Sequence, residues 1–308
     1  MDNSIETKFK EFLHLYWIRP ENALLSIFKS KALENISFDS PSLDLSCGDG
    51  LFMGIHLGGK INDEFDYFEF TDAKNFQHSS FIDIYDSLEK EYDIDFKKTA
   101  TMIDFGLDWK QNLLDKASKL KIYKKLILHD NNNIPLPFDD NFFMTIFSNS
   151  IYWIKNVEEL LVDLHRILHY DGTLILQIAT PEHFTTLKKL EQFMDSESIN
   201  IIDRNRTQTN LGLKTYSEWV DLFQKTKFKV IDVKQVYPNK RIIDFWNIGL
   251  RPIAHLLIQI FSNLNNNEKQ KIRNEWINIF FTLLKPLLHF NEQQKIEDSP
   301  YLQFILKK

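Results

Sequence analysis

Between about residues 100 and 178, short apolar segments alternate with longer segments of helical periodicity. The sequence predicts, in order, a strand at 100–106, a helix at 109–120, strands at 126–128 and 143–147, a helix at 156–168, a turn at 169–172 and a strand at 173–178. Strands that alternate with helices of about 10–15 residues form βαβ units, whose strands lie parallel in one sheet. This pattern therefore predicts an α/β protein with a mostly parallel sheet.

Further helices are expected before this region. Residues 5–18 and 21–33 are amphipathic and meet at Arg19-Pro20, and a proline is well suited to the first turn of a helix. We assign these N-terminal helices to residues 1–38. The main domain is then expected to span residues 39–308.

The last third of the chain combines strands with a helical segment. Thr215 and Glu218 have the spacing of a capping box, for a helix that ends near Thr226. The elements expected after it are a strand at 229–237, two long apolar helices at about 241–263 and 267–290, and a strand at 302–306. The two helices predict a helical hairpin inserted into the main domain over residues 239–292.

The composition excludes several classes of protein. A chain of 308 residues that is 43% hydrophobic and 26% charged can bury a sizeable core, which excludes an intrinsically disordered protein. Cys47 is the only cysteine, so neither an intramolecular disulfide nor a cysteine-rich zinc site is possible. No apolar run reaches the roughly 18–20 residues of a spanning helix, and the start of the chain does not resemble a signal peptide. We therefore expect a cytoplasmic protein without a transmembrane segment.

The net charge of −6 argues against non-specific binding to nucleic acid, which requires a basic surface. The charge is uneven, however, because residues 201–308 carry 17 basic and 10 acidic side chains. This basic third could favour an anionic acceptor, or it could form a solvated helix surface.

A glycine-containing turn follows the short strand at residues 43–45. The segment reads LDLSCGDG over residues 43–50. Gly48 and Gly50 permit backbone conformations and close approaches that a Cβ would forbid, so a ligand can lie on the main chain where the strand ends. A dinucleotide fingerprint would have a glycine in place of Met53, and Asp44 would repel a pyrophosphate but attract an ammonium group. These features favour S-adenosylmethionine over NAD or ATP.

These motifs resemble those of class I S-adenosylmethionine-dependent methyltransferases, in the small-molecule branch that includes quinone-biosynthesis enzymes. The family's first motif reads hydrophobic-Asp-Leu-Gly-Cys-Gly-x-Gly, and this chain has Ser46 at the first glycine. Residues 106–108 are similar to the second motif, and residues 129–131 to the third. The resemblance covers residues 40–180. It implies a Rossmann-like, seven-stranded, mostly parallel sheet with helices on both faces, and S-adenosylmethionine as cofactor with S-adenosylhomocysteine as product.

The resemblance also implies roles for individual residues. Asp108 would accept hydrogen bonds from both ribose hydroxyls, Trp109 would pack against the adenine, and Asp130 would receive the adenine amino group. The expected cofactor-binding residues are Asp44, Ser46, Cys47, Gly48, Gly50, Asp108, Trp109, Asp130, Asn131 and Ser148. Glu69 is an alternative ribose acid, because Gly50 and Asp108 are 58 positions apart. Residues 51–100 then form an insertion or a lid.

The acceptor is expected near the end of the strand at 143–147. Asn149, Tyr152 and Trp153 follow this strand and would line the acceptor pocket, with core packing as the alternative for the two aromatic residues. His129 and His183 are candidate bases by type and position alone.

No metal site is predicted. His165 and His169 are four residues apart on an expected helix, but no third ligand lies nearby in the sequence, so we interpret them as an exposed helix end. Cys47 is expected to be a small packing residue.

The expected function is methyl transfer to a small or medium organic acceptor, with alignment and desolvation as the protein's main contribution. Nucleic-acid bases are disfavoured as acceptors, because no Asn/Asp-Pro-Pro-aromatic segment follows the strand at 143–147. Two alternatives stay open: methylation of an anionic macromolecule such as tRNA, and a non-catalytic scaffold that binds the cofactor. The aromatic-rich hairpin could cover an apolar acceptor, form a homodimer interface or contact a membrane surface peripherally.

Overall fold

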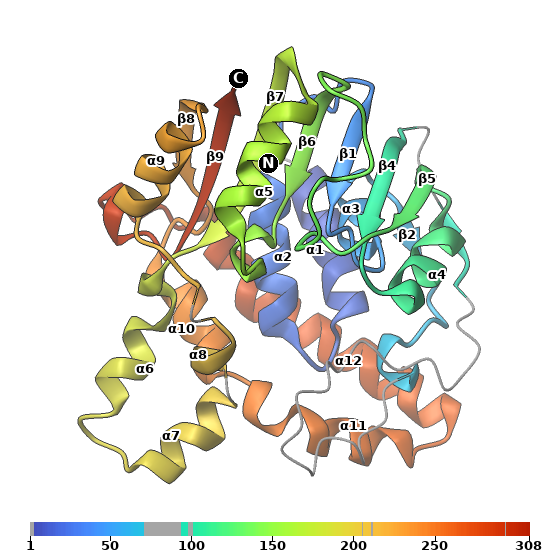
Figure 1. The fold of residues 1–308 in the computed structure, drawn as a ribbon. Helices are drawn as coiled ribbons and strands as arrows, with labels where there is room; N and C mark the ends of the chain where they lie inside the picture. The colour runs from blue at the N-terminus through green and yellow to red at the C-terminus, as the bar shows by residue number, and fades with distance from the viewer. Residues whose placement is uncertain (1–2, 71–93, 98–100, 205, 211, 293) are drawn as a thin grey trace.

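A computed structural model describes residues 3–70, 94–97, 101–204, 206–210, 212–292 and 294–308 (Figure 1). The central sheet contains, in spatial order, β5 (Tyr123–Leu128), β4 (Ile103–Asp108), β1 (Ser42–Leu45), β6 (Phe143–Ser148), β7 (Leu168–Ala179), β9 (Tyr301–Lys307) and β8 (Lys229–Gln235). Six strands share one direction, and β9 runs antiparallel to both of its neighbours. The predicted Rossmann-like, seven-stranded and mostly parallel sheet is confirmed.

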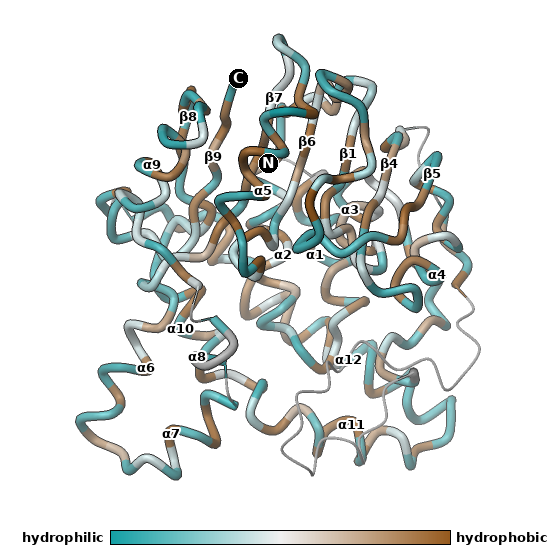
Figure 2. The backbone as a smooth tube through the Cα atoms, in the orientation of Figure 1, coloured by the Kyte–Doolittle hydropathy of each residue, from teal (hydrophilic) through white to brown (hydrophobic). Residues whose placement is uncertain are grey.

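Helices cover both faces of this sheet. The described chain contains the helices α1 (Asn3–Leu15), α2 (Pro20–Ala32), α3 (Leu51–His56), α4 (Gln111–Leu120), α5 (Val157–Ile167), α6 (Thr185–Leu190), α7 (Ser196–Asp203), α8 (Arg206–Thr209), α9 (Tyr216–Lys225), α10 (Lys240–Ile248), α11 (Ala254–Ser262) and α12 (Asn266–Leu284). One buried cluster joins α1, α2, α3 and the C-terminal helices to one face of the sheet. A second cluster joins α5 and α9 to the other face. Figure 2 shows hydrophobic residues along β1, β6 and β9, as expected for strands buried on both faces.

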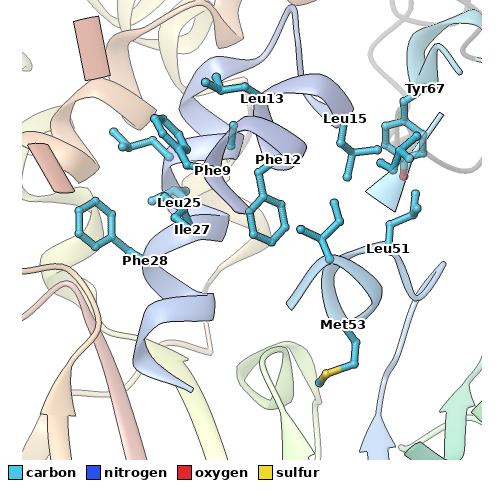
Figure 3. Close-up of a cluster of buried hydrophobic side chains, with 14 of the residues drawn as sticks. Phe9, Phe12, Leu13, Leu15, Leu25, Ile27, Phe28, Leu51, Met53 and Tyr67 are labelled. Carbon is cyan, nitrogen blue, oxygen red and sulfur yellow. The ribbon is translucent and has the colours of Figure 1, made fainter. Parts of the chain in front are cut away.

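The N-terminal helices form part of the first cluster. Phe9, Phe12 and Leu13 of α1, Phe28 of α2 and Met53 of α3 belong to one buried cluster, part of which Figure 3 shows. Both helices were expected from the sequence. The predicted division of the chain into an N-terminal segment, residues 1–38, and a main domain, residues 39–308, stays a prediction.

The strand β7 begins five residues earlier than the sequence indicates. Leu168 pairs with Phe143 and Thr173 pairs with Thr145, so five residues of β7 span the same length as two of β6. Residues 169–172, where a turn was expected, therefore form an irregular bulge within the strand.

The helical hairpin over 239–292 is more broken than its apolar pattern suggests. In place of one helix at 241–263, α10 and α11 are separated by a short 3-10 helix, Arg251–Ile253. Pro252 lies in this connection, where its missing amide hydrogen is tolerated at a helix start. The parallel strands point down in Figure 1, so α10, α11 and α12 lie beyond their carboxyl ends.

The segment expected to be an insertion or a lid is described only in part. α3 follows the glycine turn directly, and the short strands β2 (Lys60–Ile61) and β3 (Phe96–Lys97) pair antiparallel. A 3-10 helix, Tyr67–Phe70, follows β2. Residues 71–93 and 98–100 lie outside the described part, so the role of residues 51–100 stays a prediction. Among the described helices, none combines the length and the hydrophobicity that crossing a membrane would require.

Candidate functional site

The turn after β1 is held in an unusual backbone conformation. Ser46, Gly48 and Gly50 have φ angles of 62°, 59° and 75°, all in the left-handed region. A Cβ added to Gly50 would lie 2.9 Å from Cε2 of Tyr123, whereas one added to Gly48 would meet no heavy atom within 4 Å. Gly50 is therefore required by packing, while Gly48 leaves open space against the main chain. Such space allows a ligand to approach the backbone closely.

Asp108 lies at the end of β4, directly beside this turn. Its Oδ2 accepts a hydrogen bond from the backbone N–H of Gly48 at 3.0 Å, and its Oδ1 accepts one from the N–H of Lys110 at 3.0 Å. The parallel pairing of Leu45 with Leu107 brings the two strand ends together. Asp108 is buried, and this burial raises the pKa of its carboxyl group. Two residues predicted from separate motifs are thus in contact.

Asn131 connects a third strand to the same turn. It follows β5, and its Nδ2 donates a hydrogen bond to Oγ of Ser46 at 2.7 Å. Its Oδ1 is buried and accepts no hydrogen bond from any described residue. The neighbouring Asp130 is half-buried, and hydrogen bonds from the backbone and side-chain amides of Asn132 lower its pKa. The orphaned Asn131 oxygen is a candidate acceptor for a ligand's donor group.

Asp44 is a buried carboxyl group in β1. Tyr123 donates a hydrogen bond from its hydroxyl to Oδ2 of Asp44 at 2.6 Å. Burial, with a smaller contribution from the charge of Asp108, raises the pKa of Asp44 to about 7. Tyr123 belongs to no recognisable motif, and only its place at the start of β5, next to β4, indicates its role. A carboxyl group with this pKa can ionise at neutral pH when a cation approaches.

The Asp44→Asn variant is expected to change how stability depends on pH. The pKa of Asp44 rises from 3.8 to about 7 on folding, so the folded state keeps a proton that the unfolded state loses. The free energy of unfolding of the wild type therefore falls as pH rises from about 4 to 7. Asparagine does not titrate, so the variant should lose less stability over this range. Urea unfolding at pH 5 and 8 measures the difference; equal losses in both proteins would contradict the assignment, and the exposed Asp115→Asn serves as control.

Two further residues of the expected cofactor site differ in exposure. Trp109 is 61% exposed, with Nζ of Lys110 lying 5.1 Å from the centroid of its indole ring. Cys47 lies against the sheet, because a Cβ on Gly106 would come within 3.1 Å of its Sγ. Burial raises the pKa of the Cys47 thiol, so the sulfur is not a reactive thiolate at neutral pH.

The residues expected to line the pocket of the methyl acceptor follow β6, which is the neighbour of β1 in the sheet. Ser148 is fully buried, and its Oγ accepts a hydrogen bond from the N–H of Ser150 at 3.4 Å. Tyr301 of β9 donates a hydrogen bond to the backbone oxygen of Asn149 at 3.0 Å, and its hydroxyl lies 3.5 Å from that of Tyr152. The ring of Trp153 is 5.8 Å from that of Tyr152 and is 44% exposed. Sequence reasoning did not identify Tyr301, which belongs to a strand about 150 positions away.

The remaining candidates have local structural contacts. Nε2 of His129 lies 2.7 Å from the backbone oxygen of Asn133. Asp49 accepts hydrogen bonds from the N–H of Leu51, at the start of α3, and from the hydroxyl of Tyr67. Within the described ranges, no three His, Cys, Asp or Glu side chains are arranged to hold a metal ion.

A cavity of about 550 Å³ lies on the other face of the sheet. Phe105 and Ile127 line it, together with residues 135–139 before β6. Phe105 alternates along β4 with Gly106, whose missing side chain would face Cys47. The cavity therefore opens away from the glycine turn, and we assign the candidate site to the turn.

No protein-family model matches the sequence, and no curated protein matches it. Solved structures that resemble the chain include an S-adenosylmethionine-dependent methyltransferase from Thermotoga maritima, described as a possible histamine N-methyltransferase. The sequence of this methyltransferase is 14% identical to that of the chain. The two structures align with a TM-score of 0.49, and the alignment covers all of both chains.

Two other similar structures are also described as methyltransferases. An S-adenosylmethionine-dependent methyltransferase from Mesorhizobium loti is 12% identical, with a TM-score of 0.45, and covers 92% of this chain and 98% of its own. The geranyl diphosphate C-methyltransferase from Streptomyces coelicolor A3(2) is 10% identical, with a TM-score of 0.42. The alignment covers 93% of this chain and 77% of that enzyme. These similarities concern the fold alone.

Proposed function

We propose that the chain is an S-adenosylmethionine-dependent methyltransferase acting on a small or medium organic acceptor. One observation carries the proposal: the carboxylate of Asp108 lies 3.0 Å from the main-chain N–H of Gly48, beside an open backbone surface. A carboxylate has only acceptor atoms, so it can bind two vicinal hydroxyl groups. The adjacent turn offers the close main-chain approach that the rest of the nucleoside requires.

The other residues around the turn fit the same cofactor. Asp44 can ionise against the ammonium of the methionine end, and Oδ1 of Asn131 offers an acceptor without a protein partner in the described chain. The exposed indole of Trp109 is available to pack on the adenine, and Asp130 to receive its amino group. The bound cofactor would supply a methyl group already activated by the sulfonium. The chain's own task is then to hold both reactants in line and to exclude water.

The methyl acceptor is proposed to lie beyond the end of β6 and the start of β9, which meet at the same edge of the sheet. Asn149 and Tyr152 would line its pocket, with Tyr301 fixing their relative positions through the contacts described above. The sequence motifs resemble those of the branch that includes quinone-biosynthesis enzymes, which supports an organic molecule as acceptor.

Calorimetry with S-adenosylmethionine and S-adenosylhomocysteine tests this function, with NAD and ATP as controls. We expect micromolar binding of the first two ligands and none of the controls. No binding of either ligand would contradict both an enzyme and a cofactor-binding scaffold. Binding without methyl transfer to any member of an acceptor panel would favour the scaffold. Salt-dependent retention of tRNA would favour a macromolecular acceptor.

The C-terminal hairpin exposes a second candidate surface of interaction. Leu256 and Ile260 of α11 and Ile279 and Leu283 of α12 are each more than 40% exposed. A homodimer interface or a peripheral membrane contact here stays a prediction, which sedimentation and vesicle flotation would test.

A further inference from the structure

A group of basic side chains, of which Arg19 and Arg251 are buried and the others half-buried, lies beyond the carboxyl ends of the parallel strands (Figure 1). Its members, called here the basic cluster, are Arg19, Lys29, Arg204, Arg206 and Arg251. They come from α2 and the residue before it, from the segment joining α7 and α8, and from the connection between α10 and α11. Figure 1 shows α8 beside α10 below the sheet.

Trp246 of α10 stands at the centre of this cluster. The guanidinium carbons of Arg251 and Arg206 lie 4.8 and 5.4 Å from its ring centroid, and the ring of His183 lies 4.9 Å away. Nε1 of Trp246 donates a hydrogen bond to Oδ1 of Asn22 at 2.9 Å, an atom that lies 3.5 Å from Nη2 of Arg19. The buried indole thus fixes the positions of several cations around it.

Arg251 is the least satisfied member of the cluster. It is 3% exposed, yet neither Nη1 nor Nη2 donates a hydrogen bond to any group in the described chain. Burial, together with the smaller effect of the like charges of Arg206 and Arg19, lowers the pKa of Arg251 to about 9. The face of the Trp246 ring is an aromatic partner of Arg251, but a buried guanidinium whose terminal nitrogens lack acceptors is unfavourable. This indicates that a bound group supplies the missing acceptors.

The carboxylates nearby have other hydrogen-bond partners. Asp203 accepts hydrogen bonds from the N–H of Thr207, at 3.1 Å, and from its hydroxyl, at 2.9 Å. Glu21 forms an ion pair with Arg19. The basic cluster thus brings several cationic side chains close together, and an anion with several oxygen atoms can accept hydrogen bonds from more than one of them.

Lys29 connects the basic cluster to the proposed methyl-transfer region. Arg206 acts on Lys29 with like charge, and burial is the main cause that lowers the pKa of this lysine to about 8. Its Nζ lies 4.6 Å from the ring centroid of Tyr301, which donates its hydrogen bond to the backbone of Asn149. Lys29 therefore lies between the basic cluster and the residues that follow β6.

We propose, on the basis of the function proposed above, that the basic cluster binds a phosphate or diphosphate group of the methyl acceptor. Arginine guanidinium groups suit such oxyanions because they donate pairs of parallel hydrogen bonds. The acceptor is then a small phosphorylated molecule whose reactive atom lies near Asn149.

Titration of the full chain with pyrophosphate at constant ionic strength tests this inference. In Arg251→Met, the affinity for pyrophosphate should fall about tenfold or more, since a buried charge partner is lost. Arg241→Met is the matched control, because Arg241 is exposed on α10 and paired with Glu292. Should Arg251→Met fail to fold, Arg206→Gln replaces it in the same titration.

A thermal melt distinguishes a binding role from a structural one. Without anion, Arg251→Met should melt at the same or a higher temperature than the wild type, because the unpaired buried charge is gone. Pyrophosphate should raise the melting temperature of the wild type only. A lower melting temperature of the variant together with unchanged pyrophosphate affinity would overturn the inference.

A parallel titration with S-adenosylhomocysteine separates the two proposals. Wild-type protein that binds S-adenosylhomocysteine but not pyrophosphate overturns the phosphate site and leaves the proposed function standing. Binding of pyrophosphate alone overturns the proposed function. Citrate that binds as tightly as pyrophosphate would overturn the assignment to a phosphate group.

Discussion

Asp108→Ala should weaken binding of S-adenosylhomocysteine on the order of a hundredfold. The proposed cofactor site has Asp108 accepting hydrogen bonds from two ribose hydroxyls, and each bond to a charged group contributes about 1.5 kcal/mol or more. The variant also removes the acceptor for the N–H of Gly48, which loosens the turn on which the nucleoside would lie. Calorimetry with S-adenosylhomocysteine measures the effect.

Two companion variants make this result interpretable. Asp115→Ala changes an exposed carboxylate on the following helix, α4, and should bind as tightly as the wild type. Asp108→Asn keeps the shape of the side chain but loses its charge, so its affinity should lie between those of Asp108→Ala and the wild type. An unchanged affinity in Asp108→Ala would show that another acid binds the ribose, with Glu69 as the next candidate.

Substitution of the two turn glycines should separate stability from binding. Gly50→Ala combines left-handed strain with a contact of 2.9 Å to the ring of Tyr123, so the free energy of unfolding should fall by about 3 kcal/mol. Gly48→Ala has the same strain but no clash, and should cost only about 1 kcal/mol. Its new Cβ occupies the open side of the turn, however, so affinity for S-adenosylhomocysteine should fall at least about tenfold.

Urea unfolding and calorimetry on the same preparations measure both quantities. If Gly48→Ala bound the nucleoside as well as the wild type, the open space at Gly48 would not be the place where it lies. The proposed site would then have to move to another part of the sheet edge.

The fold could be predicted wherever a local pattern determines local structure. The hydroxyl of Thr215 accepts from the N–H of Glu218, whose carboxylate accepts from the N–H of Thr215, so the capping box stands where its sequence places it. The break between α10 and α11 was missed, because an apolar pattern can continue through a change in helix direction. The bulge at 169–172 depends on pairing with β6, which no local pattern encodes.

In the candidate site, too, residues in local motifs could be predicted, whereas residues brought in by the order of the strands could not. The segments around Gly48 and Asp108 could be recognised because each follows a strand in a family-like motif, and the parallel sheet brings them into contact. Tyr123 and Tyr301 have no such motif, and they reach the site through the order of strands in the sheet. Arg251 belongs to the basic last third, for which the sequence left an anionic acceptor and a solvated helix surface as alternatives. Folding buries it near residues some 50 to 230 positions away, which no local pattern indicates.

The position of β9 has a consequence for synthesis of the protein. β8 pairs with no strand of the described chain other than β9, and β9 separates it from β7. Until residues 301–307 have left the ribosome, β7 lacks its partner β9 and has an unpaired edge. Such an edge can pair with other nascent chains and so promote aggregation. Completion of the sheet must therefore wait until these residues emerge, and a chaperone that shields β7 in the meantime would raise the yield of native protein.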